Sequence, residues 1–190
     1  MFLARRPSPR DIDLFLDEQR AARLTYSPEA VSQSNPEGFN IDTARAQIGV
    51  GQAAFAAATR ALSTWQMFPR GWTEVFPFAA PVRKGDNVAV LARHLGFWSL
   101  NACRIVEGMS TSEARAGFAY GTLEDHTESG QEWFSVQLDP ADGSVWYFIR
   151  AVSRPQAPLA KLGYPVARYL QARFRRDSIE ALRSSVERSL

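Results

Sequence analysis

Glu132 and Arg104 are charged residues that fall within predominantly apolar rows of two strand-like segments. Because side chains alternate between the two faces of a strand, Glu132 shares a face with Phe134, and Arg104 shares one with Ala102. A lone carboxylate in such a row is costly unless it is paired. We therefore hypothesise that Arg104 and Glu132 meet inside the protein or at the mouth of a cavity. A purely structural ion pair, or an arginine that reaches solvent, is the alternative.

His126 lies in the acidic turn EDHTES, residues 124–129. A histidine beside carboxylates can act as a tuned acid or base, and imidazole with carboxylates also suits several divalent metals. His94 is the other of the two histidines and is distant in sequence, so no second imidazole lies at ligand spacing. We predict no metal site. A polar turn that ties down its own backbone is the favoured alternative to a catalytic His126.

Three further side chains on strand-like segments could carry chemistry. Cys103 is the single cysteine, so no internal disulfide can form, which fits a reducing compartment. A small buried thiol is favoured over a nucleophile, because no Cys-His-Asp pattern accompanies it in sequence. Tyr120 and Tyr147 could each point a hydroxyl into an apolar pocket, to orient a ligand or donate a proton. A core tyrosine bonded to a backbone group is the alternative for both.

Composition limits the classes of protein that the chain can belong to. Its 190 residues, 45% of them hydrophobic, suit a single domain over 1–190 with a sizeable core. The net charge is only +2. The most basic segment, 168–177, is as typical of a solvated helix face as of a phosphate site, so we expect no nucleic-acid partner. No apolar run is long enough to span a membrane, and no secretory signal is evident. We therefore expect a cytoplasmic protein, and the oligomeric state stays open.

Helical spacing of apolar residues appears at both ends of the chain and once in between. The last of these segments is long and amphipathic, and Pro165 should either kink it or mark the start of its regular part. The expected helices cover 8–24, within an N-terminal helical segment 1–25, then 51–68 and 155–190, with a loop over 26–39 and an extended run over 39–51.

After Pro69 the sequence changes to segments rich in β-branched and aromatic residues. Their short connections favour antiparallel neighbours, so the fold class is α+β. Gly117 and Gly121 lie inside one such segment, where they indicate a bend or a close backbone approach. The strand-like segments are 71–78, 87–93, 97–108, 115–123, 132–139 and 144–152.

This order of elements resembles the helix-grip superfamily, which includes lipid-transfer START domains, the birch-pollen-allergen group and polyketide cyclases. Within it, GFAYGTL at 117–123 followed by His126, ESG at 128–130 and Glu132 resembles the signature of a bacterial and plant family known only as a domain of unknown function. Gln131 and Thr127 depart from the acidic residue and the proline expected at those positions. If acidity at position 131 matters for the chemistry, the amide of Gln131 weakens any catalytic interpretation of this chain.

The resemblance implies a curved antiparallel sheet of about six to seven strands wrapped around a long C-terminal helix, with two further helices and a cavity. The leading prediction is binding of a small, largely apolar molecule without a cofactor. A cofactor-independent cyclase, dehydratase or isomerase acting on a natural-product-like substrate is the second, with Glu132, Tyr120, His126 or Arg104 transferring protons. A protein-interaction module that uses the Arg-rich last helix is the third. The expected ligand-binding residues are Trp65, His94, Trp98, Asn101, Cys103, Phe118, Phe134 and Tyr147.

Overall fold

The computed structural model describes residues 1–33, 36–156 and 163–190. In this part of the chain, eight strands form one antiparallel sheet. The strands are β1 (Phe2–Leu3), β2 (Asn40–Val50), β3 (Thr73–Phe76), β4 (Asn87–His94), β5 (Phe97–Thr111), β6 (Arg115–Thr122), β7 (Glu128–Leu138) and β8 (Ser144–Pro155). Seven of them follow the order β2-β8-β7-β6-β5-β4-β3, and β1 pairs with β5 outside that path.

The helices begin and end at recognisable signals. Ser8 caps the first helix in a reciprocal capping box with Asp11. The Ser8 side chain accepts from the Asp11 backbone N–H, and the Asp11 side chain accepts from the Ser8 backbone N–H. Pro165 stands in the first turn of the last helix, where its missing N–H is no loss; it marks the start of that helix rather than a kink. The described helices are α1 (Pro9–Glu18), the short 3-10 turn η1 (Gln19–Ala21), α2 (Pro28–Ser32), α3 (Gly51–Ser63) and α5 (Tyr164–Glu187).

The predicted terminal helix over 155–190 therefore starts later than expected. Pro155 is the last residue of β8, and positions 157–162 of the predicted range lie outside the described residues. The strand-like segments after Pro69 are all confirmed as strands, and neighbours along the chain are antiparallel as predicted.

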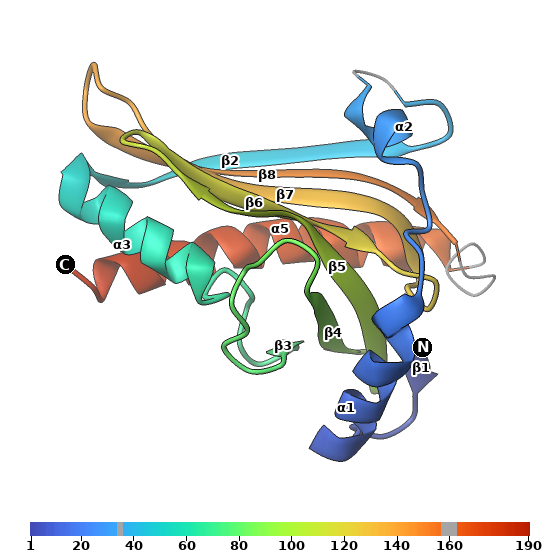
Figure 1. Cartoon of the computed structure of the whole chain (residues 1–190). Coiled ribbons are helices and arrows are strands. Elements are labelled where there is room, and N and C mark those ends of the chain that lie inside the picture. The colour runs from blue at the N-terminus through green and yellow to red at the C-terminus, as the bar shows by residue number, and fades with distance from the viewer. Residues whose placement is uncertain (34–35, 157–162) are drawn as a thin grey trace.

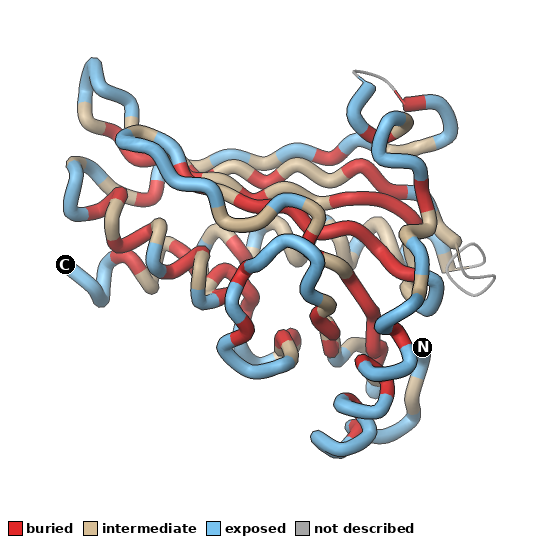
Figure 2. The backbone as a smooth tube through the Cα atoms, viewed as in Figure 1, coloured by how far each residue is buried: buried red, intermediate tan, exposed pale blue. Residues whose placement is uncertain are grey.

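The sheet curves around α5, and α3 lies on the same face of the sheet (Figure 1). The alanine-rich side of α3 packs against the sheet and against the C-terminal half of α5 through Phe55, Leu62, Leu182 and Val186, all buried. Figure 2 shows buried positions recurring along the strands and on α3. This packing forms the main core of the molecule.

The opposite face of the sheet is also partly covered. Ile12 and Phe15 of α1 pack on Leu91 and Leu100 of β4 and β5, so these two strands are buried on both faces. Val31 of α2 packs near Val152 on another part of the same outer face. None of the described helices is long and apolar enough to cross a membrane.

Candidate functional site

A cavity of about 600 Å³ lies between the curved sheet and the N-terminal half of α5. Its floor comes from β4 to β8, and its sides come from α5 and from the segment that connects α3 to β3. Because α3 packs against the other half of α5, it leaves this part of the concave face unfilled. The walls are mainly apolar and include Phe68, Trp72, Phe97, Leu170 and Phe174.

Glu132 and Tyr120 form a hydrogen-bonded pair on the cavity floor. They are directly opposite each other on β7 and β6, and the Tyr120 hydroxyl donates to Glu132 Oε2 at 2.6 Å. Both residues line the cavity. Burial raises the pKa of the Glu132 carboxyl to about 7, although the Tyr120 hydrogen bond and the charge of Arg175 act in the opposite direction. A carboxyl near neutrality beside a phenol is able to accept or donate a proton.

Two arginines whose charges act on the cavity carboxyls, Arg175 on Glu132 and Arg168 on Glu128, are ion-paired with Asp42. Arg175 Nη2 lies 3.1 Å from Asp42 Oδ1, and Arg168 Nη2 donates to the same oxygen at 2.7 Å. Asp42 is on β2, so these contacts tie the N-terminal half of α5 to the edge of the sheet. They hold α5 above the cavity floor without placing either guanidinium in the cavity wall.

His126, in the turn between β6 and β7, and Glu128, the first residue of β7, also line the cavity. The Glu128 backbone N–H donates to His126 Nδ1 at 2.9 Å, so the imidazole ties down its own turn. Burial is the main reason that the pKa of His126 is lowered to about 3, with the positive N-terminus adding to the effect. His126 is therefore neutral at pH 7. Burial raises the pKa of Glu128.

The structure brings four of the predicted site residues together at the cavity: Glu132, Tyr120, His126 and His94. His94 is at the end of β4, where burial lowers its pKa. Asn101 lies just behind the lining, because its carboxamide oxygen accepts from the Thr127 hydroxyl at 3.2 Å. What each of these residues does stays a prediction.

Five other predicted ligand-binding residues belong to the packed core instead of the cavity lining. The Trp65 indole N–H donates to the Ala80 carbonyl at 2.7 Å, and the Tyr147 hydroxyl bonds to Ser178 Oγ at 2.9 Å. Phe134 lies between Phe118 and the cavity-lining Phe174, so it supports the wall from behind. The five residues are Trp65, Cys103, Phe118, Phe134 and Tyr147.

The hypothesis that Arg104 pairs with Glu132 is wrong. Arg104 Nε donates to Asn87 Oδ1 at 2.8 Å, and its Nη2 donates to the Arg20 carbonyl at 3.1 Å, on the face of the sheet that α1 and η1 cover. Trp98, in the same row, also lies on that face. The alternation of side chains along the strand therefore correctly predicted that Arg104 and Trp98 share one face of β5. However, both faces of β5 are buried, so apolar neighbours do not identify the face that borders the cavity.

Sequence reasoning missed the part of the wall that comes from outside the strands. Trp72 lies just before β3, and Phe174 comes from α5. Phe174 is one of the apolar positions of the predicted terminal helix. Its spacing predicted that the side chain is buried, but it did not predict that the side chain borders a cavity. Over residues 1–33, 36–156 and 163–190, no group of three or more His, Cys, Asp or Glu side chains is arranged to hold a metal ion.

A curved antiparallel sheet, with a long C-terminal helix on its concave face and a cavity between them, defines an α+β protein of the helix-grip class. The sequence resemblance implied this class, and the architecture confirms it. The model of the family described as "Domain of unknown function (DUF1990)" matches residues 25–181. The chain belongs to this family.

Relatives extend over nearly the whole chain. A UPF0548 protein of Dictyostelium discoideum is 31% identical over 207 residues, covering 98% of this chain and 96% of its own length. A UPF0548 protein of Arabidopsis thaliana is 34% identical over 163 residues, covering 83% and 78% respectively. The solved structure of a hypothetical protein from Helicobacter pylori is 11% identical, with a TM-score of 0.56, and covers 84% of this chain and 94% of that chain. This last likeness concerns the fold alone.

Proposed function

We propose that the protein binds a small, largely apolar molecule in the cavity between the sheet and α5. The observation that carries this proposal is the cavity itself, which has a volume of about 600 Å³ and aromatic walls. Ligand sites of small molecules typically have this size range, with mainly apolar walls and a few oriented polar groups. Tyr120 and Glu132 supply such polar groups on the floor.

Mass spectrometry of the gently purified protein, under native and then denaturing conditions, tests the proposal directly. We expect a stoichiometric apolar compound that is released on denaturation. Ala167→Trp, which fills the cavity from α5, should reduce occupancy at least about tenfold, a loss of about 1.4 kcal/mol of binding free energy. Ala172→Trp is the matched control, because Ala172 is exposed on the same helix and outside the lining. Equal occupancy in both variants would remove the cavity as the site.

A second candidate function is proton transfer on the bound molecule, as in a cofactor-independent cyclase, dehydratase or isomerase. The observation that favours it is the Glu132–Tyr120 pair, a carboxyl with a pKa of about 7 next to a phenol, both facing the cavity. Glu132→Gln keeps the acceptor for Tyr120 and removes the titrating group. If the protein converts the compound that it carries, this variant should lose conversion by at least about a hundredfold when the compound is supplied at a saturating concentration. A compound recovered unchanged after long incubation would oppose this function.

A further inference from the structure

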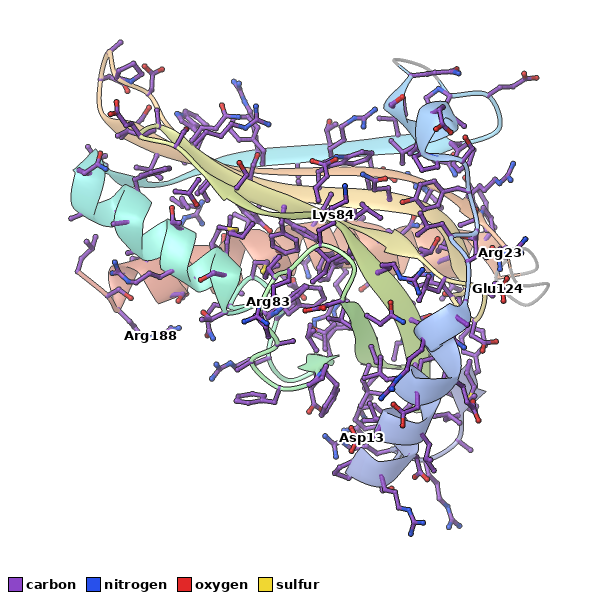
Figure 3. All side chains as sticks on the ribbon, in the orientation of Figure 1. Asp13, Arg23, Arg83, Lys84, Glu124 and Arg188 are labelled. Atoms are coloured by element: carbon purple, nitrogen blue, oxygen red, sulfur yellow. The ribbon has the colours of Figure 1, made fainter. Side chains whose placement is uncertain are left out.

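Over residues 1–33, 36–156 and 163–190, the charged side chains that line the cavity are all acidic. Glu128 and Glu132 line it, while no Lys or Arg of the described ranges does. Elsewhere on the molecule both signs are exposed, as for Lys84, Glu124 and Arg188, which are labelled in Figure 3. Among the residues that the structure describes, the charged groups lining this mainly apolar cavity are therefore all carboxyls.

Neither carboxyl forms an ion pair within the part of the protein that the structure describes. Arg175 is the cation whose charge reaches Glu132, and it is ion-paired with Asp42. The Tyr120 hydroxyl, a neutral donor, is the hydrogen-bond partner of Glu132. Since an unpaired buried carboxylate is unfavourable, a cation that entered the cavity would find a partner there.

Aromatic rings surround the same space. The rings of Phe68 and Phe174 are 5.2 Å apart between centroids, and Tyr120 lies 6.5 Å from Phe68. All three residues line the cavity together with Trp72. Ring faces attract a desolvated cation and also accommodate an apolar chain. An anionic ligand would instead meet two carboxyl groups and the negative faces of these rings.

We propose that the cavity selects a hydrophobic amine, with its ammonium group at Glu132 and its apolar body along Phe68, Leu170 and Phe174. This inference rests on the proposed binding function and adds the chemical class of the ligand. Glu128 is four residues away on the same strand, about 13 Å along it, so one ammonium group contacts one carboxylate at a time. Glu132 carries the selection because it lies on the floor beside Tyr120.

Isothermal titration calorimetry at pH 8 with dodecylamine, dodecanol and dodecanoate, each below its aggregation concentration, tests the class. These probes share one apolar chain and differ in the charge of the head; the amine is protonated at this pH. We expect dodecylamine to bind at least about tenfold more tightly than dodecanol, and dodecanoate to bind most weakly. In the Glu132→Gln variant, the dissociation constants of dodecylamine and dodecanol should lie within about twofold of each other, and that of dodecanol should equal the wild-type value.

Glu107→Gln is the matched control, since Glu107 is an exposed carboxylate on β5 that bonds to Trp133 outside the cavity lining. It should keep the wild-type preference, and thermal unfolding of both variants checks their folding. Equal binding of amine and alcohol to the wild type, or tighter binding of dodecanoate, overturns the inference but leaves the proposed function standing. An amine preference that survives in a folded Glu132→Gln variant also overturns it. Absence of binding by all three probes overturns the proposed function as well.

Discussion

The Glu132 carboxyl exchanges a proton in a pH range where most carboxyls stay ionised. Burial favours its neutral form, and neither the Tyr120 hydrogen bond nor the charge of Arg175 fully offsets that effect. Its pKa of about 7 in the fold, against 4.5 ordinarily, makes the folded protein bind a proton more tightly than the unfolded chain does. Folding and ionisation of this group are therefore coupled.

Glu132→Gln should reveal this coupling as a pH-dependent gain in stability. Below pH 4.5 the carboxyl is protonated in both states, so the variant and the wild type should unfold with similar free energies. Between pH 4.5 and about 7 the wild type should lose stability as pH rises, because only its unfolded state ionises. Above pH 7 the variant should be more stable by about 3 kcal/mol, because each unit of the pKa difference contributes about 1.4 kcal/mol. Urea unfolding at a series of pH values measures the difference.

Glu107→Gln serves as the control for this series, because Glu107 is exposed and bonds to Trp133. The free energy of unfolding of Glu107→Gln should stay within about 0.5 kcal/mol of the wild-type value at every pH. A stability difference for Glu132→Gln that is flat from pH 4 to 8 would contradict a raised pKa of Glu132.

At the scale of elements, Gly121 allows the segment before α2 to sit against the sheet. A Cβ at this position of β6 would lie 1.9 Å from the Tyr26 hydroxyl oxygen. That hydroxyl donates to Gln131 Oε1 at 2.8 Å, which links the segment to β7. The glycine is therefore required by the close approach of a side chain from another element, whereas the sequence pattern indicated a bend or a close approach of backbone.

Gly121→Ala should lower the free energy of unfolding by about 2 kcal/mol, because Tyr26 must move and its bond to Gln131 is lost. Urea unfolding measures this loss. Tyr26→Phe removes the clashing hydroxyl, so the substitution at 121 should cost less in that background than in the wild type. Additive effects of the two substitutions would mean that Tyr26 is not what Gly121 accommodates.

The Gln131 side chain has a structural role at a position where the resemblance implied an acidic residue. The family resemblance leads to the expectation of an acidic residue at position 131, and an acid there could have been catalytic. The Gln131 side chain bonds to Tyr26 and, at 3.4 Å, to Glu107, so it serves the packing of elements on the outer side of the sheet. The amide at this position leaves the Glu132–Tyr120 pair intact.

Local sequence patterns predict where the helices and strands of this fold lie. They predict less well which face of a strand borders the cavity. Period-two alternation identifies β7 and correctly places Glu132 in the row of Phe134, because the other row contains polar residues. In β5, Leu100 packs under α1 while Ile105 packs in the main core, so both rows are apolar. The direction of Arg104 then depends on which helix covers which face, and that is decided by contacts between distant segments.

At the scale of the whole molecule, the cavity results from how two helices share one concave face. At one end of the concave face, α3 and the C-terminal half of α5 pack tightly against the sheet. At the other end, the N-terminal half of α5, with Phe174, covers the sheet without filling the space beneath it, which is the cavity. The sequence predicts α1, α3, α5 and the strands β2 to β8, and the resemblance implies a cavity. The expected loop over 26–39 was wrong in part, because α2 lies within it, and β1 was not predicted. The sequence does not predict that Trp72 and Glu128 meet at the same space, since they come from the segment before β3 and from the start of β7.

We further propose that residues 1–190 form one cooperative domain that includes the N-terminal helical segment. The Met1 ammonium donates to the Leu100 carbonyl at 2.8 Å, β1 pairs with β5, and Phe15 packs in the cluster on the outer face of β4 and β5. These contacts bind the segment to central strands, so its loss would expose apolar surface on them.

Phe15→Ala should therefore destabilise the whole chain, by about 3 kcal/mol, because it removes a buried ring from α1. Urea unfolding followed by tryptophan fluorescence and by far-UV circular dichroism should show coincident transitions, both shifted to lower urea. Leu14→Ala is the control on the same helix, because Leu14 is 53% exposed; it should change stability by less than about 0.5 kcal/mol. A separate early transition for the helical segment, with the main transition unmoved, would show that this segment and the helix-grip core fold as independent units.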